Sequence, residues 1–189
     1  MADSIKTVYF SDRKEWRHWL EQNFEKEQEV WLIYPHKNSG KPRIAYNDAV
    51  EEALCFGWID STVRSLDENS SMQRFTPRKP KSGFSQPNKE RIKWLLKNSM
   101  VHPSIIESVR HIPEETFVFP EDIVIALKAD EEVWEHFQTF PPAYRRIRIA
   151  YIESARKRPE EFDKRLKNFI QKTRKNKMIG FGGIEKYYE

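Results

Sequence analysis

Residues 73–91 concentrate side chains that can bind an anion. Six cations accompany a single carboxylate, Glu90, and neutral side chains add hydroxyl and amide groups. Guanidinium and ammonium groups beside such donors can hold a phosphate, a carboxylate or a nucleic-acid backbone. A helix that starts at Ser85 would add exposed backbone N–H groups, which also favour anions. The six cations are Arg74, Arg78, Lys79, Lys81, Lys89 and Arg91.

We expect this basic loop to fold back over residues 58–60 and to enclose a charged recess. Trp58 would form an apolar wall, and Arg74 and Arg78 would bind the charge of a small anionic or polar ligand. Thr76 and the serines of the loop would orient that ligand. The predicted ligand-binding residues are Trp58, Asp60, Arg74, Thr76, Arg78, Ser82, Ser85 and Asn88.

Acidic residues near this loop allow two other interpretations. In the first, the loop is solvated and its arginines pair with Asp60, Asp67 or Glu52. In the second, Glu52 or Asp60 is the base of an enzyme, which requires a deep pocket and a strongly shifted carboxyl pKa. Glu51 and Glu52 point in different directions on one helix, which favours salt bridges to the basic loop over an acid–base pair. The sequence leaves open whether the protein is an enzyme, and it assigns no catalytic residue.

Cys55 and the five histidines form no recognisable catalytic or metal-binding motif. Cys55 lies among apolar residues of a predicted helix, which favours a buried structural thiol over a Cys55–His36–Asp60 arrangement. No two histidines share a helix face, so the spacing of a zinc site is absent. Residues 180–183 (GFGG) lack the lysine and the preceding strand of a phosphate loop. The sequence therefore predicts neither a metal nor a cofactor.

A second group of cations lies on the last predicted helix. Together with residues 74–97, this helix offers an alternative function, which is nucleic-acid binding that weakens steeply as salt rises. Its apolar face also suits a membrane surface. Acidic residues in its first turns dilute the charge, which favours a solvated face packed on partner helices. The cations are Lys164, Arg165, Lys167, Lys172, Arg174, Lys175 and Lys177.

The first half of the chain mixes helices with short strands. The helices begin at capping residues or prolines, and the strands are rich in β-branched and aromatic side chains. The three prolines of residues 77–87 predict a loop. Helices are predicted to begin at residue 11 or 12, at 47 or 48, at 85 and at 103. Strands are predicted over residues 29–35, 62–66 and 72–76, the last two as a hairpin.

The pattern becomes purely helical from Pro113 onward. Helices are predicted to begin at Pro120, Asp130, Pro142 and Pro159, each a residue type that starts helices. We therefore predict a mainly helical α+β fold, in which a small antiparallel sheet flanked by helices is followed by a helical C-terminal unit. The predicted boundaries are an N-terminal domain over residues 1–112, a helical module over 113–178 and a tail over 179–189.

The composition indicates a soluble globular protein. Apolar residues make up 38% of the 189 residues, and six Trp and twelve Phe supply large buried areas. No stretch approaches the roughly 18 apolar residues of a membrane span, and the N-terminus lacks a secretory signal. A single cysteine excludes an internal disulfide framework, so we expect a cytoplasmic protein. The net charge of +4 permits anionic partners without requiring nucleic acid, and the oligomeric state is not predicted.

Several stretches together carry a family resemblance. The most specific is residues 49–60 (AVEEALCFGWID), and further stretches extend the likeness over residues 29–170. They are residues 73–78 (QRFTPR), Ser82, 85–88, 120–122, Phe137, 144–146 and 151–155. In these residues the chain resembles the bacteriocin-protection (YdeI/OmpD-associated) family. The resemblance implies a role in stress or antimicrobial-peptide resistance, and it implies no settled reaction and no catalytic residues.

Overall fold

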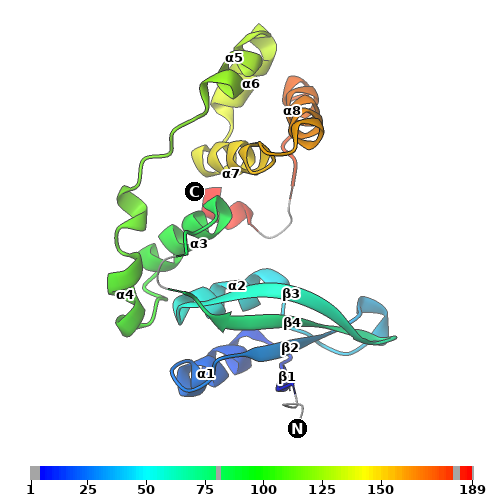
Figure 1. Ribbon diagram of the computed structural model, residues 1–189, viewed down its shortest axis with the longest axis vertical. Helices are drawn as coiled ribbons and strands as arrows, with labels where there is room; N and C mark the ends of the chain where they lie inside the picture. Colours follow the sequence, from blue (N-terminus) through cyan, green and yellow to red (C-terminus); the bar gives the residue numbers. More distant parts are fainter. Residues whose placement is uncertain (1–4, 80–81, 181–183, 189) are drawn as a thin grey trace. The chain divides into compact units, whose positions relative to one another are not determined.

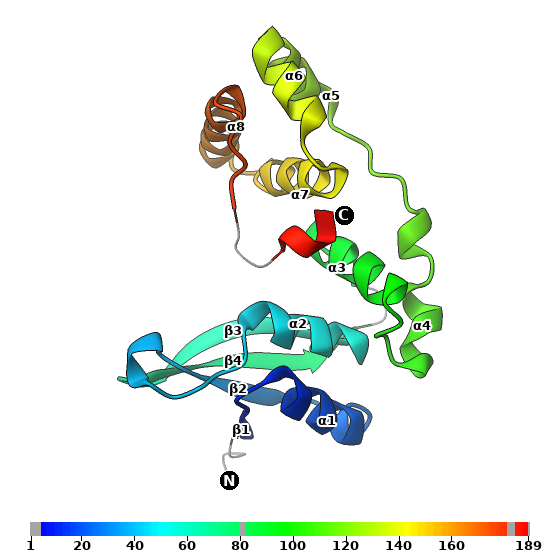
Figure 2. The same ribbon diagram turned by 180° about the vertical axis from the view of Figure 1, so that it is seen from behind.

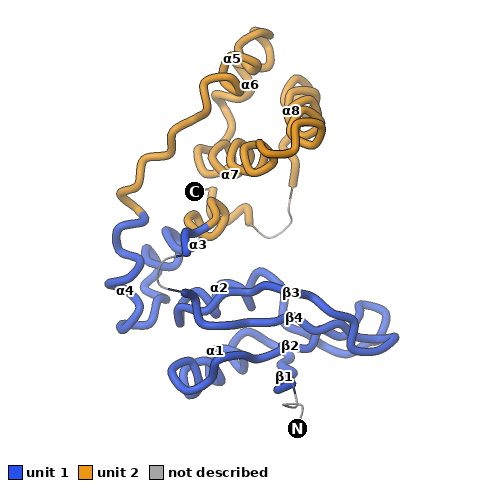
Figure 3. The backbone as a smooth tube through the Cα atoms, viewed as in Figure 1, with its two compact units in different colours: residues 1–84, 91–112 blue, residues 85–90, 113–189 orange. Residues whose placement is uncertain are grey.

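The computed structural model describes residues 5–79, 82–180 and 184–188, and the backbone divides into two compact units. Unit 1 comprises residues 1–84 and 91–112, and unit 2 comprises residues 85–90 and 113–189 (Figure 3). All described strands belong to unit 1, and the described part of unit 2 is helical, which confirms the α+β class. Whether residues 1–112, 113–178 and 179–189 behave as separate domains stays a prediction.

Unit 1 contains a four-stranded sheet with the strand order β1-β2-β4-β3 (Figure 1). Both β2–β4 and β3–β4 are antiparallel, and β3 and β4 form the predicted hairpin. The pair β1–β2 is parallel, so the sheet is mixed, and the three-residue β1 was not predicted. The strands are β1 (Thr7–Tyr9), β2 (Val30–Pro35), β3 (Trp58–Asp67) and β4 (Ser70–Pro77).

The parallel pair exists because a helix carries the chain from β1 back to the start of β2. Parallel neighbours need such a crossover, whereas antiparallel neighbours need only a turn. The crossover contains α1 (Arg13–Asn23), which begins at the predicted cap. The side chain of Asp12 accepts hydrogen bonds from the backbone N–H groups of Lys14 and Glu15, at 2.8 and 3.1 Å.

The core of unit 1 lies between the sheet and two helices, α1 and α2 (Tyr46–Cys55) (Figure 2). Trp16 of α1 is fully buried; its ring packs on Phe75 of β4, and its Nε1 donates to the carbonyl of Ala49 in α2 at 3.0 Å. A buried indole that both fills the core and satisfies its N–H group fixes α1 against α2 and the sheet. Two further helices complete unit 1, α3 (Gln86–Lys97), whose first turn belongs to unit 2, and α4 (Pro103–Val109).

Gly57 joins α2 to β3 in a conformation that favours glycine. Its φ of 72° lies in the left-handed region, and a Cβ there would sit 3.1 Å from Cδ1 of Ile105. The N–H group of Arg78 donates to the Gly57 carbonyl at 2.9 Å, so the end of β4 is tied to this junction.

The described part of unit 2 after Pro113 contains four α-helices, which begin where the sequence predicts, within a residue or two. Their apolar stripes meet in a core of aromatic and branched side chains around Tyr144 and Phe169, both almost fully buried. Among the described helices of the chain, none combines the length and apolar character that a membrane crossing requires. The helices are α5 (Glu121–Lys128), α6 (Glu131–Thr139), α7 (Pro142–Glu153) and α8 (Pro159–Arg174).

Candidate functional site

The strand register separates the predicted ligand-binding residues of the sheet onto two faces. Asp60 lies opposite Phe75, which faces the helices, whereas Arg74 and Thr76 alternate with Phe75 along β4. Side chains alternate between faces along a strand, so Arg74 and Thr76 point away from the helices and Asp60 points toward them. Asp60 therefore has different surroundings from Arg74 and Thr76, although the strands that carry them are paired.

Trp58 and Arg74 both have protein partners. Trp58 is 1% exposed, and its Nε1 donates to the carbonyl of Phe24 at 3.1 Å. Arg74 forms an ion pair with Glu29, and that guanidinium lowers the pKa of Glu29. The expectation that the loop arginines pair with Asp60, Asp67 or Glu52 is wrong for Arg74. The reason is register, because β2 places Trp31 opposite Arg74, and the side chain of Glu29 bonds the Trp31 indole at 2.7 Å.

The described residues between Arg78 and Phe84 in the basic loop are held by contacts among themselves. The guanidinium of Arg78 stacks on Phe84, 3.4 Å from the ring centroid, and donates to the carbonyl of Ser82. The Ser82 hydroxyl donates to the carbonyl of Lys79 at 2.8 Å. Lys81, one of the six predicted cations, lies outside the described residues. Arg78 is therefore presented on an aromatic surface.

Ser85 and Asn88 belong to unit 2, whereas the other six predicted ligand-binding residues belong to unit 1. The Ser85 carbonyl accepts from the N–H group of Lys89 at 2.9 Å, at the start of α3, and Asn88 lies in the first turns of that helix. A shared ligand for all eight residues stays a prediction.

Asp60 is the predicted residue with the richest polar surroundings. Its Oδ2 accepts from the Tyr46 hydroxyl at 2.9 Å and from Nε2 of Gln73 at 2.7 Å. Its Oδ1 accepts no hydrogen bond from the described residues. Tyr34 of β2 lies within electrostatic range, and its hydroxyl is buried without a hydrogen-bond partner among the residues described. These four side chains come from β2, α2, β3 and β4.

The acids Glu51 and Glu52 belong to a buried ion-pair network with α1. Both are almost fully buried, and Glu52 binds Arg13 through Oε1 and Arg17 through Oε2, the latter at 2.7 Å. Nη1 of Arg13 lies 2.9 Å from Glu51. Among the described residues, the ion pairs of Glu52 run to α1 and not to the basic loop, because α1 packs directly against α2. Both oxygens of the Glu52 carboxylate are occupied by guanidinium groups, which leaves neither open to a substrate.

Cys55 is a buried thiol, in agreement with its apolar sequence surroundings. Burial, together with the nearby Glu52, raises the pKa of Cys55 to about 12. A nucleophilic cysteine needs a lowered pKa, so this environment opposes nucleophilic chemistry. Among the described residues, no three His, Cys, Asp or Glu side chains gather as metal ligands would.

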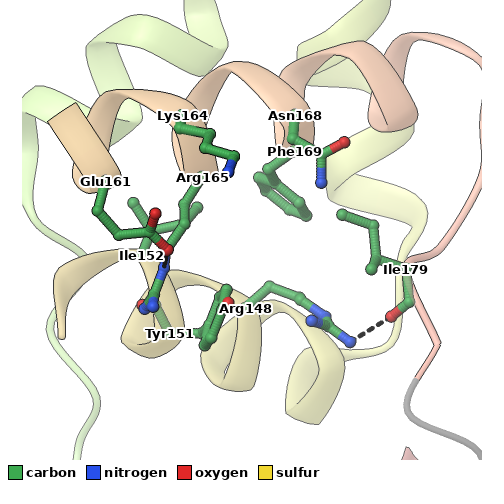
Figure 4. A pocket seen from close by; sticks show the side chains of 9 residues that line it. All are labelled: Arg148, Tyr151, Ile152, Glu161, Lys164, Arg165, Asn168, Phe169 and Ile179. Atoms are coloured by element: carbon green, nitrogen blue, oxygen red, sulfur yellow. Dashed lines mark hydrogen bonds and ion pairs between the residues drawn. The ribbon is translucent and has the colours of Figure 1, made fainter. Parts of the chain in front are cut away.

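Unit 2 contains a pocket that sequence reasoning missed, which we call the α7–α8 pocket. It has a volume of about 330 Å³ and lies between α7, α8 and the segment that follows α8. Figure 4 shows side chains of α7 and α8 on opposite sides of an open centre, with Ile179 at one end. The lining residues are Arg148, Tyr151, Ile152, Glu161, Lys164, Arg165, Asn168, Phe169 and Ile179.

Three cations line the α7–α8 pocket, against one carboxylate. Arg148 is 3% exposed, and it donates to the carbonyl of Ile179. Arg165 pairs with Glu161 at 2.7 Å, and this hydrogen bond lowers the pKa of Glu161. Lys164 is exposed and has no hydrogen-bond or ion-pair partner within the described chain. The pocket therefore carries excess positive charge.

Burial makes the charge of Arg148 costly. The pKa of Arg148 is lowered by desolvation, and the nearby Tyr144 acts in the opposite direction. An anion bound beside this guanidinium would offset the loss of hydration. The remaining walls are apolar, formed by Ile152, Phe169 and the ring of Tyr151. A small molecule with an anionic group and an apolar body matches this lining.

One sequence signal pointed to this pocket. Arg148 lies between Ile147 and Ile149, and a cation flanked by two isoleucines is a candidate for a buried position on α7. Two of the cations on the last helix, which were expected to form a solvated face, are paired within unit 2. Arg165 pairs with Glu161, and Arg174 pairs with Asp130 at 2.6 Å. Nucleic-acid binding by this helix stays a prediction.

The fold and the pocket define a two-unit α+β protein in which a helical C-terminal module holds a small basic pocket. Residues 8–108 match the family model described as a domain of unknown function (DUF8412). This match covers more than half of the sequence, and the chain belongs to that family. Residues 116–176 match the model described as "Bacteriocin-protection, YdeI or OmpD-Associated".

The second match confirms the resemblance in the C-terminal half of the chain. Residues 49–60, where the resemblance was expected to be most specific, fall within the other family model instead. The α7–α8 pocket lies almost entirely within the bacteriocin-protection match, because only Ile179 falls outside residues 116–176. No curated protein and no solved structure matched the chain significantly.

Proposed function

We propose that this protein binds a small anionic ligand with an apolar body in the α7–α8 pocket. The observation that carries the proposal is the lining: Arg148 and Lys164 lie beside apolar walls, and Arg165 and Glu161 pair with each other. Charged hydrogen bonds to a carboxylate or phosphate would fix one end of the ligand. Phe169 and Ile152 would cover its apolar body, and the volume suits a molecule of one ring.

The family description suggests how such binding would serve the cell. Direct capture of cationic peptides is disfavoured, because the chain itself carries a formal net charge of +4 and like charges repel. A small anionic metabolite is a better match for a basic pocket. We therefore place the protective role in sensing or sequestering such a molecule.

Benzoate, phenyl phosphate and benzamide test the charge requirement by isothermal titration calorimetry. Benzamide has nearly the shape of benzoate and no charge, so the pocket is expected to bind benzoate and phenyl phosphate more tightly. Equal affinity for benzamide and benzoate would contradict an anion site. The affinity for benzoate is expected to fall as salt rises, since charge supplies part of it.

Two lysines on the same helix provide a matched pair of variants. Lys164 lines the α7–α8 pocket, whereas Lys167 is exposed and does not. Lys164→Gln is expected to weaken benzoate binding about tenfold, as expected for the loss of one charged hydrogen bond. Lys167→Gln removes the same charge and is expected to change the affinity by less than about twofold. An equal effect of both would show that only the general charge of α8 matters.

A steric variant tests the location independently of charge. Asn168 is an exposed residue of α8 that lines the pocket, and Figure 4 shows its side chain on the α8 side. Asn168→Trp is expected to fill the space and abolish benzoate binding while the helical circular dichroism spectrum is retained. Full binding by a folded Asn168→Trp protein would place the ligand elsewhere.

A further inference from the structure

Unit 1 contains a polar cluster that is not part of the α7–α8 pocket. The cluster consists of Tyr34, Tyr46, Asp60 and Gln73, which come from four different elements. Cross-strand register places Tyr34 and Gln73 on the face that packs against α1 and α2, the same face to which Asp60 points. A core of Leu and Phe would normally fill that position, so the gathering of polar groups needs an explanation.

The hydroxyl of Tyr34 is the feature that points to a ligand. Tyr34 is 7% exposed, and its hydroxyl has no hydrogen-bond partner among the described residues. A buried hydroxyl without a partner is destabilising, and most buried polar atoms in proteins are satisfied by protein or by a bound molecule. Burial also raises the pKa of this phenol, and Tyr46 and Asp60 raise it further, so it stays a neutral donor.

The neighbouring carboxylate supplies the opposite half of a hydrogen-bond pair. Asp60 uses Oδ2 for Tyr46 and Gln73, and its Oδ1 accepts nothing from the described residues. A ligand must then accept from the Tyr34 hydroxyl and donate to Asp60. Tyr46 is 49% exposed, whereas the Tyr34 hydroxyl is closed to solvent, so a side chain of the cluster must move aside for a ligand to reach that hydroxyl.

The pairing of one donor with one acceptor selects the chemistry of the ligand. A carboxylate or phosphate would accept from Tyr34, but Asp60 would repel it. An ammonium group would satisfy Asp60, but it cannot accept the Tyr34 proton, and Arg43 lies close enough to act on Tyr34 electrostatically. A hydroxyl both accepts and donates, and aromatic rings such as that of Tyr46 suit the C–H face of a polyol.

We infer that the Tyr34–Tyr46–Asp60–Gln73 cluster binds a neutral polyhydroxylated ligand, such as a sugar or an inositol. This inference is independent of the α7–α8 pocket, which belongs to the other unit and takes anions. A lone water molecule has the same donor and acceptor pattern as a ligand hydroxyl, so the experiment must distinguish a polyol from water.

Saturation-transfer NMR with myo-inositol and glucose tests the inference on the full-length protein. Tyr34→Phe removes only the hydroxyl, which bonds nothing else among the described residues, so this variant is expected to fold with an unchanged or higher thermal midpoint. It is expected to lose at least about tenfold in polyol affinity. Tyr9→Phe is the matched control in the same unit, because the Tyr9 hydroxyl donates to the carbonyl of Pro42 and to no member of the cluster. Its polyol binding is expected to be unchanged.

Each contrary outcome overturns the inference. Absence of saturation transfer from either polyol at tens of millimolar would assign the cluster to bound water alone. Equal polyol binding by wild type and Tyr34→Phe, or loss of binding in Tyr9→Phe, would locate the polyol elsewhere. Choline and inorganic phosphate serve as charged probes, and Tyr34-dependent binding of either in preference to the polyols would show that the ligand is charged.

Discussion

The Glu52 carboxylate is removed from water and lies between two guanidinium groups. Removing one partner of a buried ion pair leaves the other charges inadequately compensated, which is usually more costly than breaking an exposed pair. The adjacent Glu51–Glu52 sequence allowed salt bridges to be predicted, but not their partners. Arg13 and Arg17 lie 35 or more residues away along the chain, and only the packing of α1 on α2 brings them into contact.

Glu52→Gln tests this network at the level of a single atom. The substitution keeps the shape of the side chain and removes its charge, so the free energy of unfolding is expected to fall by about 2 kcal/mol. Glu107→Gln is the control, because the Glu107–Arg110 pair is largely exposed and is expected to contribute less than about 0.5 kcal/mol. Urea unfolding followed by tryptophan fluorescence measures both. A Glu52→Gln protein as stable as the control would contradict a structural role for the network.

At the scale of elements, Asp130 joins a helix start to a neighbouring helix. One oxygen accepts from the N–H group of Val133 at 3.1 Å, which caps α6, and the other binds Arg174 of α8. The hydrogen bond from Val133 lowers the pKa of Asp130, and that from Arg174 lowers it further. The folded state therefore favours the charged carboxylate. The stabilisation is complete above the ordinary aspartate pKa and is lost as the pH falls through the lower, folded-state value.

Asp130→Ala is accordingly expected to lower the free energy of unfolding at pH 7, because α6 loses its N-terminal cap. The difference from wild type is expected to shrink below about pH 4, where the unfolded carboxyl is protonated. Asp163→Ala, which changes an exposed aspartate within α8, is expected to have an effect within about 0.5 kcal/mol. Thermal unfolding of the three proteins at pH 7 and pH 3 decides the question, and a pH-independent loss would exclude the charged cap.

Sequence patterns predicted the elements whose ends are marked by residues of the element itself. Capping residues and prolines marked the helix starts at Asp12, Pro142 and Pro159, because these residue types satisfy or omit the first backbone N–H groups. The three-residue β1 was missed, since its pairing with β2 depends on a partner more than 20 residues away. The hairpin was predicted, but β3 starts earlier than expected, at Trp58, because Gly57 ends α2 and lets the strand begin at once.

The candidate sites were harder to predict for a related reason. Asp60 was singled out, but Tyr34 and Tyr46 join it only through strand register and the packing of α2. The α7–α8 pocket depends on two helices and a following segment, and no local spacing joins Arg148 to Lys164. Composition can indicate a basic stretch, but it cannot tell which of its cations form ion pairs with acids such as Glu29 or Glu161.

At the scale of the whole molecule, unit 2 depends on a short stretch that lies far away in sequence. Glu90 is 3% exposed and accepts two hydrogen bonds from Arg146 of α7, at 2.6 and 2.8 Å. Both residues belong to unit 2, although Glu90 lies in the first turns of α3 and the rest of that helix belongs to unit 1. A bidentate pair of this kind is among the stronger side-chain interactions in proteins.

Fragments of the chain test this dependence. Residues 1–112 contain the whole core of unit 1 and are expected to fold alone, with Cys55 protected from iodoacetamide. Residues 113–189 lack Glu90 and are expected to melt at a lower temperature than the same unit in the full chain, because Arg146 loses its partner. Circular dichroism melts, with Glu90→Gln in the full chain as the control, provide the comparison. A fragment 113–189 as stable as unit 2 in the intact protein would contradict the role of Glu90.

The polypeptide passes from one unit to the other three times, after residues 84, 90 and 112. No single cleavage, stop codon or recombination point can consequently deliver both units whole. A chimera that joins the first family segment of this chain to the second segment of a relative would take Glu90 from one parent and Arg146 from the other. Exchange of modules between lineages is thereby constrained to partners in which an acid and an arginine still meet at these two positions.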